Sequence, residues 1–138
     1  MRNGDLTGLS ILILEDEPLI ALDIVWSLKQ SGADVTTARD LSSALNLAGD
    51  ADFSAAVIDY KISDADSSPL CSLLIERRIP FLIYTGNAVV QWQWQWPDVP
   101  VISKPASPCA LIAAIAGLLS QKEIPHAESA QADQRRVL

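Results

Sequence analysis

The feature that most constrains this chain is the alternation of short apolar runs with segments of helical periodicity. Five runs of four to six residues are rich in Ile, Leu, Val and Ala, and four of them are followed by a helical pattern. Near-continuous apolar runs of this length are typical of parallel strands that are buried on both faces. The expected strands are residues 9–14, 34–38, 55–59, 79–84 and 99–103.

The segments between these runs predict crossover helices over residues 18–28, 41–48, 69–78 and 107–119. Asp40 and Ser107 are expected N-caps, Gly49 is an expected helix stop, and Pro108 suits a first helical position. Strands and helices in this order predict an α/β, flavodoxin-like, doubly wound, five-stranded parallel sheet with strand order 2-1-3-4-5.

The connection between the fourth and fifth strands is the unusual one, because it contains QWQWQWP, residues 91–97. Helical spacing separates alternate residues by about 200°, so no single helical face could bury Trp92, Trp94 and Trp96 together. The alternation favours an extended segment, and the fourth helix is therefore expected to be short or irregular. The three rings are either core or an exposed anchor for a partner or a second copy of the chain.

Length and charge limit the organisation and the partners. The 138 residues predict one domain over residues 1–120 and a flexible C-terminal tail over residues 121–138, which is small, polar and charged. A net charge of −7 argues against nucleic-acid binding. No run reaches the roughly 20 apolar residues of a membrane span, and the N-terminus does not look like a signal peptide, so we expect no membrane association and a cytoplasmic location.

The two cysteines, Cys71 and Cys109, match no metal or redox spacing. Each lies among apolar residues of an expected helix, which favours small buried side chains. Their helices should cover opposite faces of the sheet, so we do not expect a disulfide between them.

Polar side chains follow four of the expected strands at their carboxyl ends, where ligands bind in such folds. Each alone is an ordinary helix-start acid, turn residue, loop hydroxyl or solvated charge. Together, the clustered carboxylates would repel one another unless a cation is bound, and carboxylates without His or Cys suit Mg²⁺ and phosphate chemistry. A carboxylate can attack a phosphoryl group while a lysine contacts its oxygens. The polar residues expected to gather at this edge of the sheet are Glu15, Asp16, Asp59, Thr85 and Lys104.

Four stretches of the chain resemble the receiver domains of two-component response regulators, the CheY-like family. They are ILILEDEPLI, AAVIDYKISD, FLIYTG and VISKPAS, and the resemblance spans Leu9 to Leu119. It implies a cis peptide before Pro105 and the following site residues: Asp59 as phosphoacceptor and metal ligand, Asp16 as direct Mg²⁺ ligand, Glu15 as a ligand through water, Lys61 as a ligand through its backbone carbonyl, Thr85 as switch hydroxyl and Lys104 as phosphate contact.

The chain departs from the family pattern at several positions near the site. Many receivers carry an aromatic residue three positions before the lysine, where this chain has Val101. The segments IPFLIYTGN and PDVPVISKP are similar to an alphaproteobacterial subgroup named for its Phe-Ala-Thr-Gly motif, but Ile83 and Tyr84 stand in place of Phe-Ala. Coupling by rotation of an aromatic residue at position 101 is therefore not expected.

The resemblance implies a stand-alone response regulator that is not an enzyme. It would accept a phosphoryl group on Asp59 from a histidine kinase or phosphotransfer protein and signal to a protein partner, with a homodimer through residues 91–101 as one form of output. One alternative is an unphosphorylated interaction module. Another is a Mg²⁺-dependent phosphohydrolase, against which Lys61 speaks because it stands where a second acid would protonate the leaving group.

Overall fold

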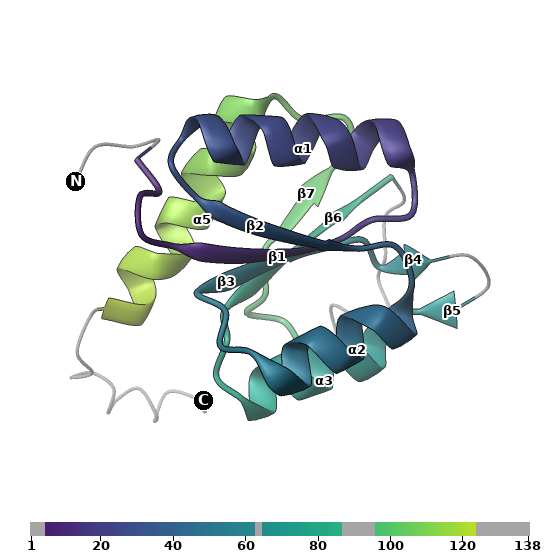
Figure 1. Cartoon of the computed structure of the whole chain (residues 1–138). Helices are drawn as coiled ribbons and strands as arrows, with labels where there is room; N and C mark the ends of the chain where they lie inside the picture. The colour runs from purple at the N-terminus through teal and green to yellow at the C-terminus, as the bar shows by residue number, and fades with distance from the viewer. Residues whose placement is uncertain (1–4, 63–64, 87–95, 124–138) are drawn as a thin grey trace.

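The computed structural model describes residues 5–62, 65–86 and 96–123. They form three layers, in which α1 and α5 cover one face of a parallel sheet and α2 and α3 cover the other (Figure 1). The elements are β1 (Ser10–Leu14), α1 (Pro18–Gln30), β2 (Asp34–Ala38), α2 (Leu41–Asp50), β3 (Ala55–Ile58), β4 (Lys61–Ile62), β5 (Ala65–Asp66), α3 (Ser68–Glu76), β6 (Phe81–Thr85), β7 (Val101–Ser103) and α5 (Pro108–Glu123).

The five-stranded sheet has the order β2-β1-β3-β6-β7, with every neighbouring pair parallel. The remaining strands, β4 and β5, pair with each other in a separate antiparallel hairpin. Counting only the strands of the large sheet, this is the expected order 2-1-3-4-5. The prediction of a flavodoxin-like doubly wound fold is confirmed.

Alternate residues of β1 belong to two different hydrophobic cores. Leu12 and Leu14 belong to the core under α2 and α3, whereas Ile11 and Ile13 belong to the core under α1 and α5. All four side chains are buried because their strand lies between helices on both faces. The continuous apolar run in the sequence is the direct result of this double burial.

Side-chain caps begin two helices where they were predicted. The Asp40 carboxylate accepts a hydrogen bond from the Ser43 amide at 2.8 Å, which lowers the Asp40 pKa. The Ser107 hydroxyl accepts one from the Ala110 amide at 3.1 Å. The expected stop at Gly49 is wrong, since α2 continues to Asp50. Across the described segments, no helix combines the length and the apolar character that crossing a bilayer requires.

The chain differs from the sequence prediction at several element boundaries. The β4–β5 hairpin forms in what was expected to be a polar loop. Helix α3 ends at Glu76 instead of residue 78, where Arg78 has a positive φ of 61°, and β7 starts at Val101 instead of residue 99. Helix α5 continues to Glu123, and residues 124–138 of the expected tail lie outside the described residues.

The two cysteines have different environments. Cys71 is buried in the core under α2 and α3, and burial raises its pKa to about 12. Cys109 is exposed in the first turn of α5, so the expectation that both side chains are buried is wrong for Cys109. Both are free thiols on helices that cover opposite faces of the sheet, as predicted (Figure 1).

Most of the tryptophan segment, including Trp92, Trp94 and the expected fourth helix, lies outside the described residues. Trp96 is half-buried and packs against the core under α2 and α3. It also lines a surface pocket of about 550 Å³ together with Phe81 and Val99. For this one ring, the interpretation as core is the one that the contacts favour.

Candidate acidic site at the strand ends

The predicted site residues lie together at the carboxyl ends of four strands. Glu15 follows β1, Asp59 follows β3, Thr85 ends β6, and Lys104 follows β7. Main-chain hydrogen bonds continue the sheet just beyond the strands and fix these residues: the amide of Asp59 donates to the carbonyl of Leu14 at 2.9 Å, and the amide of Lys104 donates to that of Thr85 at 2.9 Å. The parallel register therefore brings the side chains to one edge.

Three carboxylates form the acidic part of the site. Glu15 is 2% exposed and Asp59 is 7% exposed, whereas Asp16 is half-buried. One carboxylate oxygen from each lies within 4.8 Å of the other two. This is the group of potential metal ligands found among the described residues, and it offers only oxygen atoms.

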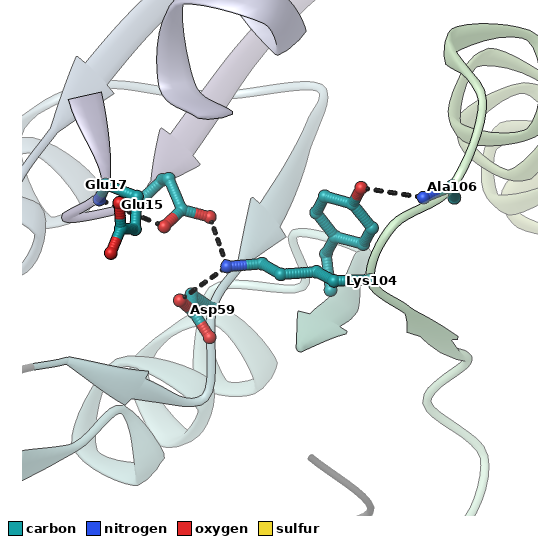
Figure 2. A network of polar contacts seen from close by, with 6 residues as sticks. Glu15, Glu17, Asp59, Lys104 and Ala106 are labelled. Carbon is teal, nitrogen blue, oxygen red and sulfur yellow. Dashed lines mark hydrogen bonds and ion pairs between the residues drawn. The ribbon is translucent and has the colours of Figure 1, made fainter. Parts of the chain in front are cut away.

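Lys104 joins two of these carboxylates. Its Nζ lies 2.8 Å from Oε1 of Glu15 and 2.9 Å from Oδ2 of Asp59 (Figure 2). The other oxygen of Glu15 accepts a hydrogen bond from the Glu17 amide at 3.1 Å. Glu15 is thus held at both oxygens, whereas one oxygen of Asp59 faces Lys104.

Burial and charge act on the site in opposite directions. The Glu15 pKa is raised, chiefly because the buried side chain loses hydration and also because the Asp59 charge is near; Lys104 and the Glu17 amide oppose this rise. Burial alone would lower the Lys104 pKa, but its hydrogen bonds to Glu15 and Asp59 and the attraction of their charges together raise it. The ammonium of Lys104 is therefore kept charged in a partly buried position.

Two predicted features of the surrounding loops are also described. The peptide bond between Lys104 and Pro105 is cis, as the resemblance implied. Lys61, the expected backbone ligand, is the first residue of the β4–β5 hairpin and lies two positions after Asp59. At the end of β6, the expected switch residue Thr85 is buried, with 3% of the residue exposed.

Sequence reasoning missed one residue that contacts the site, Tyr84. Its hydroxyl accepts a hydrogen bond from the Ala106 amide at 3.0 Å, and the Nζ of Lys104 lies 5.6 Å from the centre of its ring (Figure 2). The sequence signalled this position only as a departure from a family motif.

The site fits a small divalent cation such as Mg²⁺. Mg²⁺ prefers oxygen ligands, and it is usually held by one or two carboxylates with water and phosphate oxygens completing its shell. The cluster supplies three carboxylates without nitrogen or sulfur donors. With all groups ionised, Lys104 balances one of the three negative charges, and the remaining two match the charge of a divalent ion.

Comparisons with known proteins point to one family. No family model matches the chain. The transcriptional regulatory protein TcrA of Mycobacterium tuberculosis is 29% identical over 89 residues, 63% of this chain and 35% of TcrA. The chain therefore spans about a third of the length of this relative.

Solved structures agree over more of the chain. A response regulator receiver protein from Sinorhizobium medicae matches with a TM-score of 0.77 and 25% identity, covering 83% of this chain and 97% of that one. The receiver domain of the sensor histidine kinase PA1611 from Pseudomonas aeruginosa matches with a TM-score of 0.72 and 22% identity, covering 83% of this chain and 99% of that one. That structure has a magnesium ion coordinated in its active-site cleft.

The solved relatives share the sheet and helix arrangement described above, and the curated relative is a regulatory protein. The alphaproteobacterial subgroup stays a prediction. The chain has the fold of the CheY-like receiver domains of response regulators, and the resemblance to them that its sequence motifs show is confirmed.

Proposed function

We propose that this chain is a phosphorylatable receiver in which Asp59 accepts a phosphoryl group from a phosphohistidine. The observation that carries the proposal is the shared ammonium of Lys104, bonded to Glu15 and Asp59 beside the half-buried Asp16. This arrangement combines a carboxylate nucleophile, a positive contact for phosphoryl oxygens and a set of ligands for a divalent cation.

In the proposed step, a carboxylate oxygen of Asp59 forms a bond to phosphorus while the phosphorus–nitrogen bond of the phosphohistidine breaks. The bonding electron pair stays on the imidazole nitrogen, which takes a proton from solvent. Asp16, Asp59 and the Lys61 carbonyl would hold Mg²⁺ directly, and Glu15 would hold it through water. Bound Mg²⁺ supplies positive charge that offsets the negative charge of the phosphoryl oxygens.

Lys104 and Thr85 would respond to the new group. Lys104 would leave Oδ2 of Asp59 and contact a phosphoryl oxygen, because that oxygen then carries more negative charge than the carboxyl group of the acyl phosphate. The Thr85 hydroxyl, buried at the end of the neighbouring strand, would donate to another phosphoryl oxygen. Moving these two side chains would alter the loops that follow β6 and β7.

The proposed unit of function is the domain of residues 1–120, with residues 121–138 as a tail. Its phosphoryl donor is a sensor histidine kinase or phosphotransfer protein, and its output is a protein partner and not a catalysed reaction. A homodimer through residues 91–101 and a cytoplasmic location stay predictions. Of the proposed dimer segment, the structure describes residues 96–101.

The test is phosphorylation of wild type and Asp59→Asn with acetyl phosphate and Mg²⁺, read by intact-mass analysis. We expect one phosphoryl group on wild type and none on the variant. Equal gains would show that another residue is modified. No gain in either, also with kinases of the source organism as donors, would favour the alternative of an unphosphorylated interaction module.

A further inference from the structure

Tyr84 lies beneath the turn that carries Lys104. The residue is buried, with 5% of it exposed, on the sheet face covered by α1 and α5. Its hydroxyl accepts the Ala106 amide hydrogen at 3.0 Å, and its ring lies 5.6 Å from the ammonium of Lys104 (Figure 2). One side chain therefore contacts both the end of the turn and the charged group at its start.

The backbone explains why the hydroxyl matters at this position. Pro105 has no amide hydrogen, so Ala106 supplies the first main-chain donor after Lys104. The Lys104 amide itself donates to the Thr85 carbonyl at 2.9 Å. Two consecutive residues of β6, Tyr84 and Thr85, thus bind the two ends of the turn.

We infer that Tyr84 is a positioning residue for phosphoryl acceptance, an inference that rests on the proposed function. Lys104 has three attractive neighbours, the carboxylates of Glu15 and Asp59 and the face of the Tyr84 ring. When Asp59 is phosphorylated, its carboxyl group becomes part of an acyl phosphate and attracts the ammonium less strongly. The ring and the anchored turn then keep Lys104 within reach of the phosphoryl oxygens.

Tyr84 stands where the similar Phe-Ala-Thr-Gly motif has alanine. Val101, in turn, stands where many receivers have an aromatic residue. An aromatic side chain is therefore present beside the lysine, but it comes from β6 and not from β7. The hydroxyl of Tyr84 accepts a hydrogen bond from the main chain inside the domain. This contact suits a role in holding the turn in place better than a role in signalling at the surface.

The test is a double-mutant cycle of wild type, Tyr84→Phe, Lys104→Met and the double variant. Each protein is assayed for its rate of phosphoryl gain from acetyl phosphate and for its affinity for beryllofluoride with Mg²⁺. We expect Tyr84→Phe to weaken beryllofluoride binding roughly fivefold, the effect of one lost hydrogen bond, and to change the Ala106 amide resonance. In the Lys104→Met background, the same change should have no further effect on binding.

The matched control is Tyr60→Phe, which removes the hydroxyl of another buried tyrosine from the opposite core. We expect its effect to be the same with or without Lys104. The positioning role would be overturned if Tyr84→Phe left the affinity for beryllofluoride unchanged, or lowered it equally with and without Lys104. It would also be overturned if Tyr84→Phe no longer unfolded cooperatively. Absence of phosphoryl gain in wild type would overturn the proposed function as well, whereas gain with an unaffected Tyr84→Phe would overturn the positioning role alone.

Discussion

The Nζ of Lys104 lies 2.9 Å from Oδ2 of Asp59, although the two residues are 45 positions apart in the chain. The same ammonium lies 2.8 Å from Glu15, so one positive charge serves two buried carboxylates. With Asp16 included, the cluster has three carboxylates and one ammonium, so positive charge is in deficit. Both the stability of the domain and its response to ions should depend on this deficit.

Mg²⁺ should stabilise the folded domain. Only the folded chain brings Glu15, Asp16 and Asp59 together, so an ion bound there favours folding by about 1.4 kcal/mol when its concentration is ten times its dissociation constant. The measurement is the melting temperature as a function of MgCl₂, with NaCl at matched ionic strength as control. We expect Asp16→Asn to reduce the shift. An identical shift in this variant would place the ion elsewhere.

Glu15→Gln should stabilise the domain at neutral pH without Mg²⁺. Because the Glu15 pKa is raised in the folded state, folding favours the protonated carboxyl. The stability gained from the protonated carboxyl is fully present below the pKa of Glu15 in the unfolded chain, about 4.5. This stability is lost as the pH rises through the higher pKa of the folded state. The melting temperature of Glu15→Gln should therefore exceed that of wild type at pH 7, and the difference should shrink towards pH 4.

Glu17→Gln is the matched control, since Glu17 is exposed and its contact with Glu15 uses only the backbone amide. Its melting curve should follow that of wild type across the same pH range. If Glu15→Gln were less stable than wild type at pH 7, the ion pair with Lys104 would outweigh the burial of the charge.

Lys104→Met should destabilise the domain at neutral pH, because it leaves Glu15 and Asp59 facing each other without the shared ammonium. Loss of a partner from buried polar groups costs about 1–3 kcal/mol. Urea unfolding at pH 7 measures this cost, and Lys29→Met, at an exposed position in the last turn of α1, controls for the loss of one positive charge. Mg²⁺ should recover more stability in Lys104→Met than in wild type. Equal recovery in the two proteins would contradict this account.

The two thiols should react at very different rates. Cys109 is exposed in α5, whereas Cys71 is buried and its pKa is raised to about 12, so very little of its reactive thiolate is present near pH 8. An aromatic disulfide reagent should modify one thiol in the native protein and both in urea. Cys109→Ser should remove the fast phase, and a fast phase that survives in this variant would show that Cys71 is reached in the folded state.

Much of the fold could be predicted because burial on both sheet faces produces apolar runs that a sequence shows directly. The runs at β1, β3 and β6 are clear for this reason. The β4–β5 hairpin was missed because strands of two residues have no periodicity to detect. Cys109 was misjudged because an apolar pattern does not show where a helix first meets the sheet, and in α5 burial begins at Leu111.

The site could be located because parallel strands place their carboxyl ends at one edge, so residues that follow the strands meet without any local signal. The contact between Tyr84 and Ala106 could not be predicted in the same way. The pair is 22 residues apart, and the contact depends on the path of the turn after β7. The sequence indicates which residues gather at the edge, whereas the hydrogen bonds among them depend on loop geometry.

The strand order also determines the sequence in which a growing chain can assemble these charges. Glu15 and Asp59 come together once β3 joins β1, whereas Lys104 is added only when β7, the last strand, pairs with β6. A nascent chain emerging from the ribosome would therefore gather its carboxylates before the residue that neutralises part of their charge has been synthesised. A sheet that still lacks β7 would hold these carboxylates without their shared ammonium, so it would stay open to misfolding until the last strand is added.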